Sequence, residues 1–297
     1  MHIITTAIEH NSVLRPLRQC ERLGAEVDYV RLDTDTEDLV YDDFERLVTP
    51  RTKLLVTNTG SNVTGLVPDF DYIADFAKRH DLIWIADGSQ TAGQLDISLA
   101  ETGIDALIFT GHKSLYGPQG SGGGVVSERF LDFPRDTLYT HSGGTGSHSQ
   151  SLDPPEEFPD IYEAGTQNMN GISGLAIGIR YLQERGMDKI QARTRELDRY
   201  MLDGLTAFGD KIKLYGAKAP RRVPVISISV PGWDSADLAD ALATDFNIAS
   251  RSGLHCAPLV HQSYGTTATG LVRFSLSSIT RKEDIDALVA ALTELIG

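Results

Sequence analysis

The chain has 297 residues, 41% of them hydrophobic, enough for a large core in one big domain or two of ordinary size. Its 41 acidic and 27 basic residues give a net charge of −14, which disfavours nucleic acid because phosphate binding needs clustered Lys and Arg. No apolar run is long enough to span a membrane, and the N-terminal MHIITTAIEHNS is unlike a secretory signal. The two cysteines are far apart in the sequence and make no disulfide framework. We therefore expect a cytoplasmic protein.

The first half of the chain alternates short apolar runs with helical patterns. The apolar runs predict strands, and apolar residues at helical spacing predict helices. Strands are predicted at residues 3–6, 27–32, 54–58, 82–86 and 106–110, and helices at 11–23, 41–48 and 70–80. Strands that are hydrophobic throughout and alternate with helices indicate an α/β fold with a mostly parallel central sheet, covered on both faces.

The second half begins with a long loop, because residues 133–171 are rich in Gly, Ser, Pro and His. His141 and His148 in this loop are interpreted either as substrate-channel residues or as solvated loop residues. Helices are then predicted at residues 172–182, 187–208, 236–245 and 282–296, with a strand at 225–230. We place the domain change near residue 185, which predicts a large domain over residues 1–185 and a smaller C-terminal α/β domain over 186–297.

Polar groups follow three of the predicted strands. They are Asn62 after the strand at 54–58, Asp87 and Gln90 after the strand at 82–86, and Lys113 after the strand at 106–110. Ligands of open parallel sheets bind beyond the carboxyl ends of the strands, so we expect these groups to converge. Taken singly, Asp87 is equally read as a helix cap and Lys113 as a surface charge. Together they supply the amine, the carboxylate and the donor that a pyridine aldehyde cofactor requires.

Three segments of the chain resemble a known enzyme family. IADGSQTAG at 85–93 and FTGHKSLYGPQGSGG at 109–123 resemble the class V aminotransferases, which use pyridoxal 5'-phosphate (PLP) and have the PLP-dependent transferase fold type I. RSGLHCAPL at 251–259 resembles the R-x-G-x-H-C-A segment of group II cysteine desulfurases and selenocysteine lyases. The resemblance implies a homodimeric enzyme that converts L-cysteine to L-alanine and passes the sulfur to an acceptor protein. It implies no metal.

The resemblance also implies roles for individual residues. Lys113 is expected to be the Schiff-base lysine, and Cys256 the nucleophile that takes the sulfur as a persulfide. The expected cofactor contacts are Asp87 at the pyridine nitrogen, Gln90 at the phenolic oxygen, His10 stacked on the ring, Thr110 and His112 at the phosphate, and Thr166 at the phosphate of the neighbouring subunit. Asn62, Arg251 and Arg273 are expected to bind the substrate.

Other interpretations of the cysteines and of the reaction stay open. A lone cysteine is commonly a small buried hydrophobe. Cys256, however, lies in a Gly-containing segment after Arg251, and cationic neighbours favour the reactive thiolate form of a cysteine. Cys20, on a predicted helix, is interpreted as structural or incidental. The alternative functions are a selenocysteine lyase, another β-lyase or an aminotransferase, and a non-catalytic scaffold or sulfur-relay partner.

Members of the family have a leading segment, on the order of 80 residues, before the strand that corresponds to residues 3–6. That segment includes a helix N-terminus that holds the cofactor phosphate. The 297 residues contain no evident substitute for it. We therefore expect the isolated chain to be poorly stable or to hold little PLP.

Overall fold

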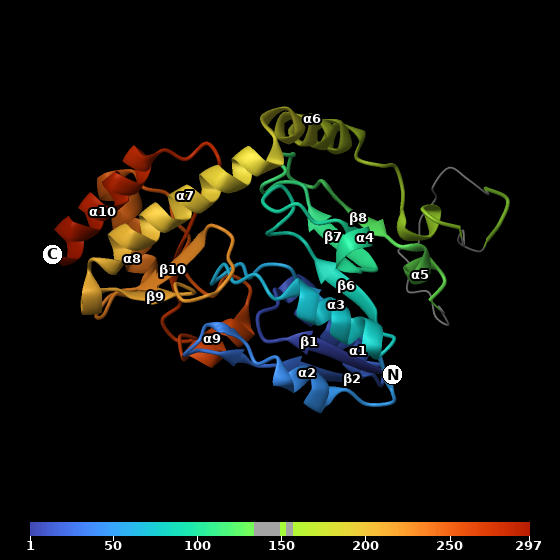
Figure 1. The fold of residues 1–297 in the computed structure, drawn as a ribbon. Helices are drawn as coiled ribbons and strands as arrows, with labels where there is room; N and C mark the ends of the chain where they lie inside the picture. The colour runs from blue at the N-terminus through green and yellow to red at the C-terminus, as the bar shows by residue number, and fades with distance from the viewer. Residues whose placement is uncertain (134–148, 153–156) are drawn as a thin grey trace.

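A computed structural model describes residues 1–133, 149–152 and 157–297 of the chain. The larger of its sheets consists of β1 (His2–Thr6), β2 (Glu26–Val30), β5 (Thr52–Asn58), β6 (Ile83–Asp87), β7 (Ala106–Thr110) and β8 (Gly122–Val126). The strand order is β2-β1-β5-β6-β7-β8, and every neighbouring pair is parallel except β7 with β8 (Figure 1). The predicted α/β fold with a mostly parallel central sheet is therefore confirmed.

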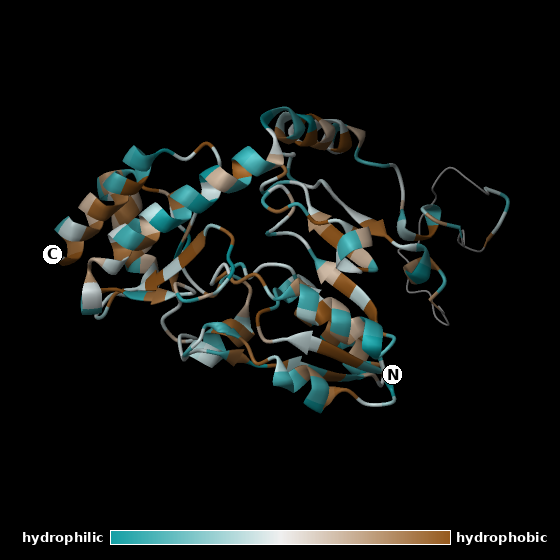
Figure 2. Ribbon diagram, in the orientation of Figure 1, coloured by the Kyte–Doolittle hydropathy of each residue, from teal (hydrophilic) through white to brown (hydrophobic). Residues whose placement is uncertain are grey.

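Helices cover both faces of this sheet. The helices of the first half are α1 (Asn11–Arg22), α2 (Asp42–Leu47), α3 (Phe70–Arg79), α4 (Leu99–Thr102) and α5 (Glu128–Leu131). Successive residues of a strand point to opposite faces, so Ile4 packs with Phe44 of α2 and Phe76 of α3, whereas Ile3 packs with Leu17 of α1. Figure 2 shows hydrophobic residues concentrated on the strands, while α3 carries hydrophobic and hydrophilic residues side by side, as an amphipathic helix does.

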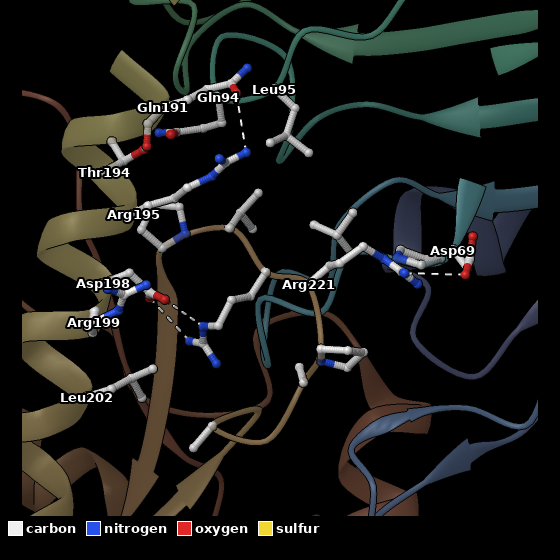
Figure 3. A pocket seen from close by; sticks show the side chains of 18 of the residues that line it. Asp69, Gln94, Leu95, Gln191, Thr194, Arg195, Asp198, Arg199, Leu202 and Arg221 are labelled. Carbon is white, nitrogen blue, oxygen red and sulfur yellow. Dashed lines mark hydrogen bonds and ion pairs between the residues drawn. The ribbon is translucent and has the colours of Figure 1, made fainter. Parts of the chain in front are cut away.

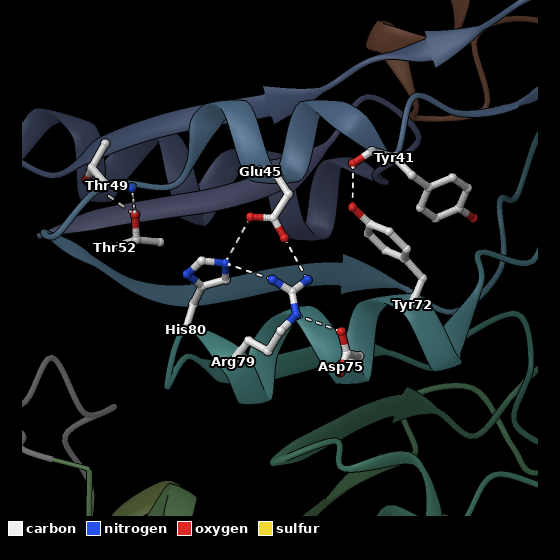
Figure 4. Close-up of polar contacts among 8 residues, drawn as sticks. All are labelled: Tyr41, Glu45, Thr49, Thr52, Tyr72, Asp75, Arg79 and His80. Carbon is white, nitrogen blue, oxygen red and sulfur yellow. Dashed lines mark hydrogen bonds and ion pairs between the residues drawn. The ribbon is translucent and has the colours of Figure 1, made fainter.

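Polar contacts join α2 and α3 at their outer edge (Figure 4). Glu45 forms an ion pair with Arg79 at 2.6 Å and lies 3.1 Å from His80 Nε2. The Tyr72 hydroxyl donates to the carbonyl oxygen of Tyr41 at 2.9 Å. Exposed ion pairs contribute little to stability, so the apolar faces of these helices, rather than this edge, hold them on the sheet.

A smaller antiparallel sheet lies toward the C-terminus, with strand order β11-β10-β9 (Figure 1). Its elements are β9 (Lys213–Tyr215), β10 (Val225–Ser229), β11 (Val272–Ser275), α7 (Met187–Thr206), α8 (Ser235–Phe246) and α10 (Lys282–Ile296). Leu197, Leu238 and Leu288, one from each helix, form a buried cluster with Ile228 of β10. This sheet therefore has a core of its own.

The segment around Cys256 returns to the larger sheet. The helix α9 (Pro258–Tyr264) follows it, and Val260 and Leu271 belong to the same buried cluster as Ile4. The domain change predicted near residue 185 falls between α6 (Met169–Arg185) and α7. The assignment of residues 186–297 to one smaller domain stays a prediction. Val260 and Leu271, which lie in that range, pack in the same buried cluster as Ile4 of the larger sheet.

Two parts of the secondary structure differ from the sequence-based expectation. The edge strand β8 was not predicted, because Gly122–Gly124 have no hydrophobic alternation; backbone pairing with β7 forms it. The loop expected over residues 133–171 contains a 3₁₀ turn at Asp160–Tyr162 and the start of α6, whose first turn is capped by Asn168. His141 and His148 lie outside the described residues. No helix in the described ranges has both the length and the apolar character to cross a bilayer.

Candidate active site

The candidate site lies at the carboxyl edge of β5, β6 and β7. In the strand register Asn58, the last residue of β5, pairs with Asp87, the last residue of β6, and Asp87 pairs with Ile108 of β7. Lys113 follows β7 after two residues, in a loop closed by the bond from the Tyr116 N–H to the Lys113 carbonyl at 2.9 Å. Asp87 and Lys113 are therefore placed at the same sheet edge, as the sequence predicted.

Lys113 lines a cavity of about 290 Å³ together with Gln90 and Arg273. The partial loss of water around its ammonium group lowers the pKa of Lys113, and the neighbouring Arg273 lowers it further, whereas the Asp87 carboxylate opposes the shift. A lysine with a lowered pKa exposes more free amine near neutral pH, which is what a nucleophilic lysine needs.

His10 caps the N-terminus of α1, and the charges of both Lys113 and Asp87 act on it. Its Nδ1 accepts the Ser12 N–H at 3.0 Å, so the proton of the neutral ring is on Nε2. Burial lowers the pKa of His10, the charge of Lys113 lowers it further, and Asp87 opposes this. His10 is thus within electrostatic reach of both groups that the sequence assigned to the cofactor.

The Cys256 segment lies against the start of α1. The N–H of Asn11 donates to the Cys256 carbonyl at 2.7 Å, which places this half-buried cysteine beside His10. Asn62 Nδ2 donates to the His255 carbonyl at 2.6 Å. His255 and Cys256 both have left-handed backbone conformations, with φ of 49° and 57°, which non-glycine residues seldom adopt. Strain of this kind is typical of functional segments.

Arg273 connects this segment to the lysine cavity. Its Nη1 donates to the Asn62 carbonyl at 3.0 Å, and its backbone pairs with that of Arg251. Burial lowers the pKa of Arg273 to about 10, with Arg251 lowering it and Cys256 raising it. Arg273 Nε and Asn62 Oδ1 are buried without a hydrogen-bond partner within the described part of the chain, which is unusual for buried polar atoms.

The predicted phosphate ligands are only partly brought together. Thr110 Oγ1 and His112 Nδ1 are hydrogen-bonded at 2.7 Å beyond the end of β7. Thr166 is exposed in the segment before α6, and no hydrogen bond found among the described residues joins it to Thr110 or His112.

Sequence reasoning missed three buried titratable residues. His255 is 3% exposed, and burial lowers its pKa to about 3; its ring lies 5.8 Å from that of the buried His261. Glu9 is fully buried directly before His10. An acidic residue at the end of an apolar strand is the one signal that would have drawn attention to Glu9, because burying a charge is costly.

A larger cavity of about 850 Å³ lies elsewhere, between α7 and residues 217–224. Figure 3 shows Arg195 and Arg199 of α7 on one side of it and the ion pair of Arg221 with Asp69 on the other. Its lining does not include Lys113, so we centre the candidate site on the smaller cavity.

The groups around this edge of the larger sheet fit PLP. An amine with a lowered pKa, a carboxylate and an imidazole lie at one sheet edge, and the unpartnered Arg273 Nε and Asn62 Oδ1 face no protein partner. This donor set matches the needs of an aldehyde-bearing pyridine ring and of an amino-acid substrate.

Comparisons with known proteins show the family of this chain. Residues 1–288 match the sequence model of the family described as aminotransferase class-V. A probable cysteine desulfurase of Xylella fastidiosa is 34% identical over 301 residues, covering 99% of this chain and 69% of that protein. A cysteine desulfurase of Salmonella agona is 33% identical, covering 99% of this chain and 71% of that protein.

Solved structures of cysteine desulfurases have the same fold as this chain. The cysteine desulfurase CsdA (S-sulfonic acid) of Escherichia coli superposes with a TM-score of 0.88 at 28% identity, covering all of this chain and 73% of that one. The apo cysteine desulfurase of Thermococcus onnurineus gives a TM-score of 0.85 at 29% identity, covering 99% of this chain and 72% of that one.

Proposed function

Because this chain belongs to the class-V aminotransferase family, whose fold type I it shares, we propose that it is a PLP-dependent cysteine desulfurase. The proposed reaction converts L-cysteine to L-alanine and leaves the sulfur on Cys256. The observation that carries it is the 2.7 Å bond from Asn11 to the Cys256 carbonyl, which holds the cysteine beside His10 and hence beside the edge that bears Asp87 and Lys113.

The cofactor is held, in this proposal, by groups from several strands. When bound, PLP withdraws electrons from the bonds at the α-carbon of an amino acid. Asp87 would bind the ring nitrogen and keep it protonated, and Lys113 would hold the cofactor through its aldehyde. The remaining contacts would be Gln90 at the phenolic oxygen, His10 on the ring face, Thr110 and His112 at the phosphate, and Thr166 at the phosphate of a second subunit.

The substrate carboxylate is bound by Arg273, Arg251 and Asn62. The planar fork of a guanidinium suits a carboxylate, and Arg273 Nε is buried without a partner among the residues described. Arg251 is exposed and lies next to Arg273 through their backbone pairing. Binding here would direct the substrate side chain toward Cys256, since Asn62 also holds the His255 carbonyl.

The residues of this chain then move the proton and the sulfur. The Lys113 amine takes the proton from the substrate α-carbon. The Cys256 thiolate attacks the substrate sulfur, so that a sulfur–sulfur bond forms as the bond between Cβ and sulfur breaks. The electron pair of the broken bond stays with the β-carbon, which takes up the proton that the Cys256 thiol lost, and Lys113 returns its proton to the α-carbon. Cysteine and the Cys256 thiol thus become alanine and a Cys256 persulfide. The further expectations of a homodimer, a cytoplasmic location and a sulfur-acceptor protein belong to the same proposal.

Replacing Cys256 by Ala tests the reaction, and the other cysteine offers a matched control. C256A is expected to abolish the persulfide and to reduce alanine formation from cysteine by at least about 100-fold, because the sulfur has no acceptor atom. C20A, in the half-buried cysteine of α1, is expected to keep both. The measurements are alanine release and persulfide mass on the PLP-loaded chain. Full alanine release in C256A would show that the sulfur leaves the substrate without Cys256, as in another β-lyase or a selenocysteine lyase.

A further inference from the structure

Glu9 is a buried acid that the proposed chemistry does not use. It is 0% exposed. Its Oε1 accepts the Thr6 hydroxyl at 2.5 Å and the Asn58 N–H at 2.9 Å. Its Oε2 is buried with no hydrogen-bond partner in residues 1–133, 149–152 and 157–297, and no ion pair found there includes Glu9. Both donors to this carboxyl are uncharged.

An ionised carboxylate in this position would be strongly unfavourable. A buried charge needs a counter-charge or several hydrogen bonds, and Glu9 has two neutral donors on one oxygen and none on the other. The charged neighbour that acts on it is Asp87, also an acid. Burial raises the pKa of Glu9 to about 8, the bonds from Thr6 and Asn58 oppose the shift, and Asp87 adds to it.

The surroundings of Glu9 connect it to the candidate site. It directly precedes His10, the cap of α1. Asn58, which donates to Glu9, pairs in register with Asp87 and also donates through Nδ2 to the carbonyl of Ile8 at 2.5 Å. The turn over residues 8–10 is therefore fastened to the end of β5 at two points, the Ile8 carbonyl and the Glu9 side chain.

We propose that Glu9 is a positioning residue that, as a neutral carboxylic acid, fastens the His10 turn to the end of β5 without adding a second carboxylate charge beside Asp87. The role of Glu9 beside a cofactor ring at Asp87 rests on the proposed function. The protonation of Glu9 is independent of the proposed function, because it follows from the packing of β1, β5 and β6.

The pH dependence of unfolding tests the protonation directly. Between the ordinary pKa of 4.5 and the folded value of about 8, the folded chain keeps a proton on Glu9 that the unfolded chain has lost. The folding constant of the wild type therefore falls about tenfold per pH unit relative to that of E9Q, which has no such proton. Urea denaturation of both proteins from about pH 5 to pH 8 measures this ratio. A ratio that does not change with pH would overturn the proposal.

Two further measurements keep the test decisive. If E9Q fails to fold, the infrared carbonyl band of a protonated carboxylic acid in the wild type at pH 7 decides, and its absence in the folded wild type contradicts the proposal. The matched control is E37Q. Glu37 is also buried, but its two oxygens accept the backbone N–H groups of Gly216 at 2.9 Å and Lys218 at 2.6 Å. In E37Q an NH₂ group replaces one of these oxygens and cannot accept a hydrogen bond from the backbone N–H. The folding constant of E37Q is therefore expected to fall.

The positioning role is tested by binding of PLP, followed by its absorbance. E9A is expected to bind PLP at least about tenfold more weakly than the wild type at pH 6, because the His10 turn loses its fastening, and E9Q is expected to restore most of that affinity. Wild-type affinity in E9A would overturn the role. If the wild type binds no PLP even at saturating concentration, the cofactor assignment fails for this chain, while the unfolding experiment still decides the protonation of Glu9.

Discussion

Much of the chemistry proposed for this chain depends on the charges around Lys113. On its position alone Lys113 would be an ordinary surface charge. Its surroundings lower its pKa, mainly through lost hydration, and Arg273 and Arg251 act in the same direction. Asp87 acts in the opposite direction. The reactivity of this amine therefore depends on residues from β6, β11 and the Arg251 segment as well as on its own loop.

The opposing effect of Asp87 gives a prediction for the pH dependence of Lys113. Reductive methylation by formaldehyde, followed for each lysine by peptide mass spectrometry, reports the free amine without any cofactor. Half-maximal reaction of Lys113 is expected below the usual pKa of 10.5. D87N is expected to shift it to still lower pH, because the carboxylate that stabilises the ammonium is gone. Lys53, an exposed residue of β5, serves as the internal control. A shift to higher pH in D87N would contradict the assigned geometry.

The loop that carries Lys113 is shaped by its contact with one helix. A Cβ on Gly178 of α6 would overlap the carbonyl oxygen of Leu115, and one on Gly174 would overlap the ring of Pro118. The rings of Tyr116 and Tyr181 meet edge to face with centroids 5.6 Å apart. The glycines of α6 thus allow the helix to lie directly on the Lys113 loop.

The close contact of α6 predicts the effect of a single methyl group. G178A is expected to lower the free energy of unfolding by about 1–3 kcal/mol, since the overlap with a backbone carbonyl outweighs the better helix propensity of Ala. It should also change the methylation rate of Lys113. In G204A of α7 the new methyl group meets only the tip of Val289 at 3.0 Å, so its effect is expected to be smaller. Equal stabilities of G178A and the wild type, measured by urea denaturation, would rule out the contact.

A buried ion pair joins α7 to the chain that enters the smaller sheet. Arg222 Nε lies 2.7 Å from Asp198 Oδ2, and the two side chains are 11% and 10% exposed. Arg222 also donates to the carbonyl of Val225 at 3.0 Å and to that of Gly216. Burial raises the pKa of Asp198, and the charge of Arg222 opposes that shift. The pair forms one wall of the larger cavity, so its loss would affect the arrangement of both sheets.

Breaking this pair from one side is predicted to be more harmful than replacing both partners. R222A leaves the buried Asp198 carboxylate unpaired and is expected to cost about 3–5 kcal/mol of unfolding free energy. The double variant D198L/R222M is expected to recover most of that loss, because no buried charge remains. Urea denaturation measures both. R18A, which breaks the exposed pair of Arg18 with Glu21, is the control and should change stability little. A milder effect of R222A than of the double variant would contradict a buried, coupled pair.

Hydrophobic periodicity was sufficient to predict most helices and strands of the fold. The strands that became β1, β5, β6 and β7 and the helices α1, α3 and α7 were predicted within a few residues of their ends. The strand predicted at 27–32 is divided, since residues 26–30 pair with β1 and Leu32–Asp33 pair with Asp38–Leu39. β8 was missed because its pairing with β7, and not its side chains, defines it. Hydrophobic periodicity shows which residues of an element are buried, so it gives little signal for a strand of exposed residues such as Gly122.

The sequence by itself determined the α/β class, the family and the placement of Asp87 and Lys113 beyond successive strands, because these depend on local patterns and motifs. The tertiary structure alone decided which distant groups meet: the Cys256 carbonyl on Asn11, Asn62 on the His255 carbonyl, and a buried Glu9 without a cation. The roles assigned to the site residues, those of Lys113 and Cys256 included, stay predictions. Whether a polar group is buried, paired or free depends on what packs against it, and that partner lies far away in the chain.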